Sequence, residues 1–557
     1  MRKGWLLFVI GWLLILGGSW LASAIQTSEG IKVEDVRFAG TGGVTMSGLL
    51  YTPPNATAAR PAPGILAVHG YINSRETQSA FAIEYARRGY VVLALDQTGH
   101  GYSGGAAFSN GFGGPDGLKH LRGLPTVDKA NIGLEGHSMG GWTVLAAAAT
   151  MPDAYKAVVL EGSSTGAPFA GEGTPTWPRN TALVFSRYDE FSKLMWGVSR
   201  AADVGTSAKA KALFGSKETL QTGRLYGDLA DGTARRLYTP TTTHPGDHIS
   251  TQAVGDSLDW FARTLTGGTP RPAGDQIWMW KEAGTGIALI GFVALLLGTF
   301  AVLLNLPPFA VLRGAPTPTA TRTGGWWLRL SLAALIPVLT YFPAFIAVTL
   351  LIKPSAALPQ TVTTQVVLWA LINLAITLLI GLFGKRPEAA PRRSILIPAV
   401  LIAIAVSAVG YLSLVVVDRL FLVDFRFWVV ALKLFSPRQA VIALIYLLPL
   451  TAFFWVSLTA LHRRLTGQYL TAIAAMAGGF LLFLVVDYGL FFATGRLPTD
   501  FDPLTTVIAI QFVPVLAAAA VISTFAWRRT GSALPGALIC GLIVTWYMVA
   551  GTATQSL

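Results

Sequence analysis

Repeated apolar runs in the second half of the chain limit its fold more than any other feature. From Ile287 to the end of the 557-residue sequence, these runs are about 20 residues long, enough for a helix to cross a bilayer. Only 13% of all residues are charged, against roughly 25% in an average soluble domain. Residues 31–276 have ordinary polar content, so the charge deficit falls in the second half. The sequence predicts a polar domain followed by a multi-pass membrane domain.

The predicted domains are 1–29, 30–267 and 286–557, with a linker at 268–285. Trp5–Ala24 is expected to be a transmembrane anchor or a signal peptide, because Ala22-Ser23-Ala24 resembles a cleavage site. The anchor is favoured, since the apolar run is long for a signal peptide. About eight helices are expected in 286–557, with candidate spans Gly286–Leu306, Trp327–Ile352, Val366–Phe383, Ile395–Val417, Ala440–His462, Leu470–Ala493, Thr505–Trp527 and Ala533–Ala553.

Basic residues in the loops predict the orientation. With the N-terminus inside, the cytoplasmic loops carry the paired cations, and the opposite loops carry scattered basic residues, several beside acidic ones. The cytoplasmic set is Arg313, Arg322, Lys385, Arg386, Arg392, Arg393, Arg463, Arg464, Arg528 and Arg529. This pattern places the polar domain outside the cytoplasm. It requires Leu420–Pro437 to lie in the outer interface, where we expect an amphipathic helix.

The net charge of +13 and the single cysteine exclude several other classes. Most basic pairs stand at the ends of apolar segments, so they are topology signals and predict no nucleic-acid partner. Cys540 stands alone, which excludes an intramolecular disulfide and gives no support for a metal site. No cofactor is expected, and no oligomeric state is predicted.

Gly136-His137-Ser138-Met139-Gly140 carries the chemistry of the polar domain. It lies between a predicted strand, Ala130–Glu135, and a predicted Ala-rich helix, Gly141–Thr150. A serine on such a sharp strand-to-helix turn has an exposed hydroxyl above a helix N-terminus, which is the geometry of a catalytic nucleophile. Ser103 lies in a similar Gly-x-Ser-x-Gly pattern, but more glycines follow it and no helix does. Ser138 is therefore the predicted nucleophile, and Ser103 is interpreted as part of a turn.

An earlier predicted strand, Ile65–Val68, ends at His69-Gly70-Tyr71. The loop after this strand supplies one oxyanion-hole amide in folds with such an elbow, and the residue after the nucleophile supplies the other. This nominates the backbone N–H groups of Tyr71 and Met139. His69, and the pair Asp96 and His100 after the strand Tyr90–Leu95, are interpreted as residues that shape loops.

The acid and base are expected after the nucleophile in the chain. Asp189 follows the apolar strand Ala182–Phe185, where a carboxylate can orient an imidazole. Glu190, Asp228 and Asp231 are the alternatives. His248 directly precedes an amphipathic helix, Ser250–Leu265, and is the preferred base. His244, before Pro245, remains the alternative.

Three stretches resemble the broad group of dienelactone-hydrolase and prolyl-oligopeptidase-like serine hydrolases. They are His69-Gly70, the segment from Asp96 to Ser103, and the segment from Val127 to Gly141. The resemblance covers residues 31–267 and implies an α/β-hydrolase fold with a doubly wound sheet, followed here by an all-α transmembrane domain. It also implies an acyl-enzyme mechanism through Ser138, Asp189 and His248, with no single substrate. The segment Phe191–Asp231 is expected to form a lid.

The sequence leads to the hypothesis of a membrane-embedded serine hydrolase that cleaves a carboxylic ester outside the cytoplasm. A small-molecule or lipid ester is the expected substrate, and membrane lipids are the expected surroundings. A serine peptidase or an acyltransferase of the same fold is the alternative. From another class, the alternative is a transporter or sensor with a non-catalytic hydrolase-like domain. Asp487, a carboxylate inside an apolar span, is a further candidate for function or for a structural role.

Overall fold

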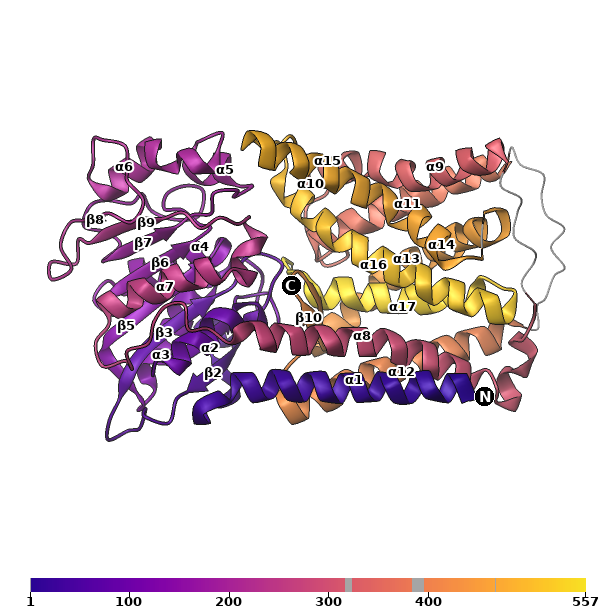
Figure 1. The fold of residues 1–557 in the computed structure, drawn as a ribbon, viewed down its shortest axis with the longest axis horizontal. Helices are drawn as coiled ribbons and strands as arrows, with labels where there is room; N and C mark the ends of the chain where they lie inside the picture. The colour runs from indigo at the N-terminus through magenta and orange to yellow at the C-terminus, as the bar shows by residue number, and fades with distance from the viewer. Residues whose placement is uncertain (1, 316–322, 383–394, 466, 557) are drawn as a thin grey trace.

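The computed structural model describes residues 2–315, 323–382, 395–465 and 467–556. Figure 1 shows two halves joined end to end. A sheet covered by helices forms one half, and long helices lying side by side form the other. The N-terminus lies at the far end of the helical half, and the C-terminus lies between the two halves.

The sheet has nine strands in the order β1-β2-β4-β3-β5-β6-β7-β9-β8. Strands β3 to β7 and β9 form the parallel core, whereas the pairs β1–β2, β2–β4 and β8–β9 are antiparallel. The strand bounds are Lys32–Ala39, Thr45–Thr52, Ala62–Val68, Val91–Asp96, Val127–His137, Ala157–Glu161, Thr181–Val184, Leu225–Tyr226 and Arg235–Tyr238. The carboxyl ends of the parallel strands meet at one edge, where such sheets bind ligands.

Helices cover both faces of this sheet because its central strands are apolar on both sides. In β3, Leu66 and Val68 pack toward the face covered by α3 and α4, whereas Ile65 and Ala67 pack toward α2 and α7. The helices are α2 Ser79–Arg87, α3 Gly114–Gly123, α4 Met139–Thr150, α5 Ser192–Trp196, α6 Ala208–Phe214 and α7 Thr251–Thr264. This doubly wound sheet confirms the predicted α/β-hydrolase fold.

The helical half confirms the second part of the predicted fold class. Its helices are α1 Arg2–Gln26, α8 Trp278–Leu303, α9 Gly324–Leu339, α10 Tyr341–Leu351, α11 Thr361–Leu382, α12 Leu396–Phe421, α13 Pro437–Arg464, α14 Tyr469–Met476, α15 Gly478–Thr494, α16 Pro503–Thr530 and α17 Leu534–Gly551. Within the described ranges, eight helices are long and apolar enough to cross a membrane, with α9 and α10 counted as one. The pair α14 and α15, bent by 55°, would make a ninth span.

Helix α1 packs closely along α8 through glycines spaced by seven residues on each helix. A Cβ atom at Gly11 would lie 2.6 Å from the backbone nitrogen of Leu295, and one at Gly18 would lie 2.4 Å from the carbonyl oxygen of Gly284. On α8, a Cβ at Gly298 would lie 2.3 Å from the backbone nitrogen of Phe8. Such close approach of two backbones stabilises helix pairs in membranes through van der Waals packing. The N-terminal segment is therefore an integral part of the helical bundle.

The segment between α12 and α13 differs from the prediction. The amphipathic helix expected in Leu420–Pro437 is absent, and a hairpin of β10 (Phe425–Phe427) and β11 (Val430–Leu432) is found instead. An amphipathic helix would expose its charged residues to solvent. Here Asp424, Arg426 and Lys433 are all buried between the two halves. Helix α8 also begins at Trp278, inside the expected linker.

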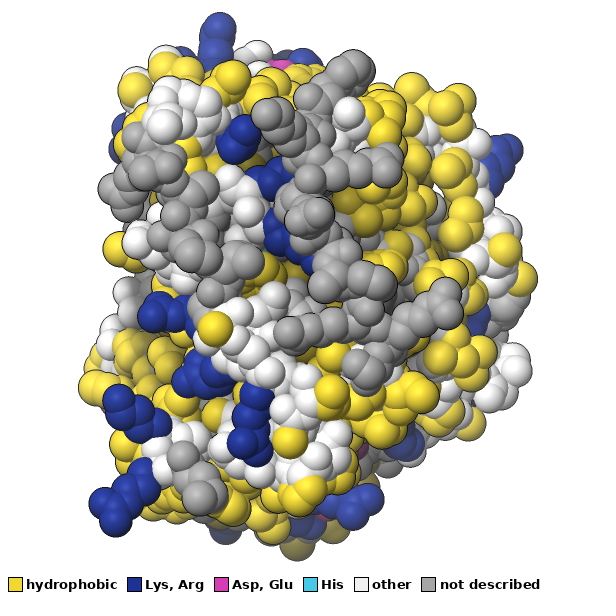
Figure 2. All heavy atoms as spheres, turned by 90° about the vertical axis from the view of Figure 1, so that its right-hand side faces the viewer, with side chains coloured by type: hydrophobic (Ala, Val, Ile, Leu, Met, Phe, Trp, Pro, Cys, Tyr) yellow, Lys and Arg dark blue, Asp and Glu magenta, His cyan; other side chains and the backbone are white. Residues whose placement is uncertain are grey.

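The end of the helical half farthest from the sheet carries many basic side chains. Figure 2 shows Lys and Arg spread over this end with few acidic groups visible. Arg463 and Arg464 end α13, Arg528 and Arg529 lie in the last turn of α16, and Arg2 begins α1. Of the predicted cytoplasmic set, Arg322, Lys385, Arg386, Arg392 and Arg393 lie outside the described residues.

Candidate active site

Ser138 occupies a strained turn between β5 and α4. Its φ and ψ are 56° and −122°, a combination that few non-glycine residues adopt. The turn fits only because its neighbours lack side chains: a Cβ at Gly136 would lie 2.2 Å from the carbonyl oxygen of Gly140, and one at Gly140 would lie 2.1 Å from the carbonyl oxygen of Val68. The hydroxyl is therefore fixed at the carboxyl edge of the sheet, directly before the N-terminus of α4.

The loop after β3 lies beside this turn. The Cα of Gly70 approaches so closely that a Cβ there would lie 3.1 Å from the Cβ of Ser138. Tyr71 and Met139 both line the cavity that contains Ser138. Among the described residues, neither backbone N–H donates to a protein acceptor. Two amides without an acceptor beside a serine hydroxyl meet the geometric requirement of an oxyanion hole.

Asp189 is paired with His244 and not with His248. The Nδ1 atom of His244 lies 2.8 Å from Oδ2 of Asp189, while Oδ1 accepts a hydrogen bond of 2.8 Å from the backbone N–H of Phe191. Both ring nitrogens of His248 lack a partner in the described part of the chain. The expected contact between Asp189 and His248 is thus not formed, and the alternative histidine takes its place.

The register of the sheet explains this difference. Val184 of β7 lies opposite Tyr238 of β9, and a bridge between Tyr188 and Thr243 continues the parallel register beyond both strands. The residues that follow this bridge in the chain, Asp189 and His244, therefore meet. A helical turn over Pro245–Ile249 then places His248 away from Asp189. The position of His248 directly before the next helix therefore does not identify the histidine that pairs with Asp189.

Two residues of the helical half hold the loop that carries His244. The hydroxyl of Tyr488, on α15, donates a hydrogen bond of 2.7 Å to Oε1 of Glu190, whose Oε2 accepts one of 2.8 Å from the backbone N–H of His244. The indole N–H of Trp428, between β10 and β11, donates to the carbonyl oxygen of Pro245 at 2.7 Å. The helical half is therefore a structural part of the site.

A cavity of about 660 Å³ contains Ser138, His244 and His248, and it lies between the two halves. This volume is in the range of small-molecule sites. The hydrolase half contributes mostly apolar and aromatic walls, and the helical half contributes Trp428, Val429 and residues 500–504 with Val507 and Gln511. Of the segment Phe191–Asp231, which is expected to form a lid, Phe191, Lys193, Leu194 and Met195 line this cavity.

The residues interpreted as loop-shaping have the contacts that such a role requires. His69 accepts from the backbone N–H of Gln97 and approaches the carbonyl oxygen of Gly70 at 2.7 Å. Asp96 is fully buried and accepts hydrogen bonds from the backbone N–H groups of Arg75 and Tyr102. Nδ1 of His100 lies 3.0 Å from the carbonyl oxygen of Thr98, and Ser103 donates to the carbonyl oxygen of Asp96.

The alternatives for the acid have other partners or positions. Glu190 lines the cavity, but its carboxylate oxygens accept hydrogen bonds from the Tyr488 hydroxyl and the backbone N–H of His244, and burial raises its pKa to about 8. Asp228 accepts hydrogen bonds from backbone groups of its own surface turn, and neither it nor Asp231 lines the cavity.

Asp487 is buried in α15 and accepts a hydrogen bond of 3.0 Å from the hydroxyl of Thr499. Thr499 belongs to the loop between α15 and α16, and the next residues of that loop line the cavity. This contact gives the Asp487 carboxylate a partner and ties α15 to the loop that forms one wall of the cavity. Within the described ranges, no group of three His, Cys, Asp or Glu residues is arranged to hold a metal ion.

Comparisons with known proteins support a hydrolase. The family described as "Serine aminopeptidase, S33" matches residues 59–188. The monoacylglycerol lipase of Mycolicibacterium smegmatis is 33% identical over 140 residues, which cover 23% of this chain and 46% of the lipase. The chain thus spans about half the length of this curated relative.

Solved structures of similar domains include the thioesterase domain of the curacin biosynthetic pathway, at 16% identity and a TM-score of 0.29, and an esterase from Pyrococcus furiosus, at 16% identity and a TM-score of 0.31. The match to the thioesterase domain covers 41% of this chain and 98% of the thioesterase chain. The match to the esterase covers 43% of this chain and 94% of the esterase chain.

Proposed function

We propose that this protein is a membrane-embedded serine hydrolase that cleaves carboxylic esters through an acyl-enzyme. The observation that carries the proposal is the convergence of Ser138 on its strained turn with the hydrogen-bonded pair of Asp189 and His244 at one cavity. The aminopeptidase family matches residues 59–188, which include Ser138, and the similarity to the lipase also favours ester hydrolysis.

In the proposed mechanism, Oγ of Ser138 attacks the ester carbonyl carbon while His244 takes the hydroxyl proton. Asp189 holds Nδ1–H of His244, so that the other ring nitrogen is free to act as the base. The backbone N–H groups of Tyr71 and Met139 stabilise the oxyanion. His244 then protonates the leaving alcohol, and water releases the acid from Ser138. None of these steps uses a cofactor.

A lipid ester is the substrate that the surroundings of the cavity favour. Four apolar side chains on its rim, each between 38% and 63% exposed, come from both halves: Phe108, Phe169, Leu194 and Phe501. An ion pair of 3.2 Å between Lys193 and Asp500 joins the halves at the same rim. Exposed apolar groups beside charged ones suit a site at the membrane surface, where an amphiphile keeps its tail in lipid.

Ester hydrolysis by the purified full-length protein in lipid nanodiscs tests this proposal. We expect turnover of p-nitrophenyl butyrate and of a monoacylglycerol, with a free acid as the product. An aminopeptidase substrate of comparable size tests the peptidase alternative, and acylated acceptor alcohols among the products test acyl transfer. Binding of esters without any turnover would instead favour a non-catalytic sensor or transporter.

We further propose that the hydrolase half lies outside the cytoplasm in the cell membrane, because the basic end of the helical half lies opposite to it (Figure 2). Cys540 is buried, and its replacement by Ser allows single cysteines to report topology. We expect Lys217→Cys, in the hydrolase half, to react with an impermeant maleimide in intact cells. Leu306→Cys, after α8, should react only after lysis. The reverse labelling pattern would overturn the orientation.

The pH dependence follows from the burial of His244, which lowers its pKa to about 4. The imidazole must be neutral to accept the Ser138 proton, so activity is present above this pKa and lost as the pH falls through it. We expect kcat/KM for p-nitrophenyl butyrate to hold down to about pH 5 and to fall near pH 4. An exposed histidine would give a fall near its usual value of about 6.5 instead.

Tyr488→Phe tests the contribution of the helical half. Loss of its hydrogen bond to Glu190 should loosen the His244 loop and lower kcat about tenfold, the effect of a hydrogen bond worth about 1.4 kcal/mol, with KM little changed. Tyr411→Phe is the matched control, because within the described residues its hydroxyl accepts from the backbone N–H of Phe435 and has no contact with the His244 loop. Equal kcat values for the two variants would contradict this role.

A further inference from the structure

A second cavity, here called the shaft, adjoins the site cavity and lies mostly among the helices of the helical half. It has a volume of about 60 Å³, and it shares four lining residues with the site cavity: Ile72, Asn73, Val429 and Gln511. Most of its other walls belong to α11, α13, α16 and α17, and the rest come from Ser74, Thr552 and the hairpin segment with Arg426, Ala431 and Lys433. The two cavities therefore adjoin along a common wall.

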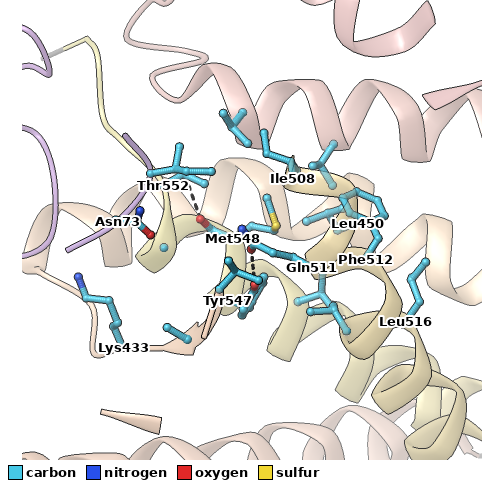
Figure 3. Close-up of a pocket in the computed structure, with 18 of the residues that line it drawn as sticks. Asn73, Lys433, Leu450, Ile508, Gln511, Phe512, Leu516, Tyr547, Met548 and Thr552 are labelled. Atoms are coloured by element: carbon cyan, nitrogen blue, oxygen red, sulfur yellow. Dashed lines mark hydrogen bonds between the residues drawn. The ribbon is translucent and has the colours of Figure 1, made fainter. Parts of the chain in front are cut away.

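The shaft runs along the helices and away from the sheet. On α16, Leu504 and Val507 line the site cavity, whereas Ile508, Phe512 and Leu516 line the shaft. From Leu504 to Leu516 an α-helix advances about 18 Å. Figure 3 shows the same order, with Asn73 and Lys433 at the end near the hydrolase half and Leu516 at the opposite end.

The chemistry of the shaft changes along its length. Polar side chains stand near the active site: Asn73, Arg426, Lys433 and Gln511, the last bonded to the hydroxyl of Tyr547. Farther in, the walls are apolar, formed by Val366, Trp369, Leu450, Phe453, Phe512 and Leu516. An amphiphile placed here would have its polar group toward Ser138 and its tail among the helices.

The inner end of the shaft adjoins a third cavity of about 200 Å³ at Trp369, Phe453 and Leu516. The shaft is thus the smallest of three adjoining cavities and lies between the two larger ones. An apolar space that extends along helices in this way suits an extended hydrocarbon chain.

From this arrangement we infer that the shaft is an acyl-chain site: the helical half binds the fatty acyl chain of the ester while Ser138 attacks its carbonyl carbon. The inference rests on the proposed ester hydrolysis and names its substrate class, esters of long unbranched fatty acids. Each methylene that leaves water for the shaft should raise kcat/KM roughly fourfold until the shaft is filled.

Chain-length profiles of shaft variants test this inference. Ile508→Trp fills the shaft near its entrance, and Leu516→Trp fills it about 12 Å farther in. Ile510→Trp is the matched control, because Ile510 lies on the same helix, is half-buried and does not line the shaft. The substrates are p-nitrophenyl butyrate, decanoate and palmitate.

We expect Ile508→Trp to lower kcat/KM for decanoate and palmitate at least about tenfold. For butyrate, kcat/KM should stay within about twofold of the wild-type value. Leu516→Trp should lower kcat/KM for palmitate, whereas kcat/KM for decanoate should stay within about threefold of the wild-type value. Palmitate activity that is unchanged in both variants would overturn the inference, as would an equal loss of butyrate and palmitate in a variant with the wild-type melting temperature. If the wild type hydrolysed no ester, the proposed function itself would fail instead.

A probe on the wild-type protein needs no folded variant. A long-chain alkyl fluorophosphonate with a terminal diazirine should attach to Ser138 and, on irradiation, cross-link to α11, α13, α16 or α17. Cross-links confined to α5 or α6 would place the chain in the hydrolase half and contradict the shaft.

Discussion

Replacement of Ser138 by alanine is expected to lower kcat/KM for ester hydrolysis by on the order of 10⁵. The reason is that alanine removes the attacking oxygen, so that no acyl-enzyme can form, while the amides of Tyr71 and Met139 keep only a small residual rate. The strained backbone is retained, because alanine adds no atoms to the turn. Initial rates with p-nitrophenyl butyrate measure the effect.

Ser103→Ala is the matched control, since this serine stands in the second Gly-x-Ser-x-Gly pattern. Its hydroxyl donates to the carbonyl oxygen of Asp96 and accepts from the backbone N–H of Ser47, so we expect a loss of stability and little loss of kcat. A Ser138→Ala protein with more than one-tenth of wild-type activity would remove Ser138 from the mechanism.

The second large effect separates the two histidines. We expect His244→Ala to lower kcat on the order of 10⁵, since the serine then has no base, and His248→Ala to lower it less than about tenfold. The expectation rests on the 2.8 Å contact between His244 and Asp189 and on the absence of any polar partner for the ring of His248 among the described residues.

Melting temperatures of both variants control for folding, because both side chains are buried. If His248→Ala were the inactive protein and His244→Ala the active one, the proton transfer would have to run through His248. In that case the hydrogen bond between His244 and Asp189 would be structural only.

The strained turn at Ser138 and its surroundings could be predicted from sequence because the signals are local. The elbow needs glycines at fixed positions around Ser138, a strand before it and a helix after it, and all of these lie within a short stretch. The strand ends that carry Asp189 and the loop of Tyr71 were predictable in the same way, from apolar runs followed by polar residues.

The choice of histidine depended on contacts that local patterns do not encode. The register between β7 and β9 brings Asp189 to His244, and register follows from packing across the sheet. A helical turn that begins at Pro245 then places His248 away from Asp189, although His248 is nearer to the following helix in the sequence.

The contributions of the helical half were also beyond sequence reasoning. Trp428 and Tyr488 lie far from Ser138 in the chain, in segments whose aromatic residues fit any membrane helix or interface. The expected helix at Leu420–Pro437 is a hairpin because Arg426 pairs with Asp424 at 2.8 Å and also donates to Ser74 and Thr77 of the hydrolase half. A buried charge needs such partners, and a solvent-facing helix would not supply them.

Covalent labelling tests the central claim, that Ser138 is an activated nucleophile, most directly. The full-length protein in nanodiscs is treated with a fluorophosphonate, digested, and analysed by mass spectrometry. We predict one adduct, on Ser138, with a labelling rate reduced at least about 10³-fold in His244→Ala. Labelling on another residue, or equal labelling of wild type and Ser138→Ala, would contradict it.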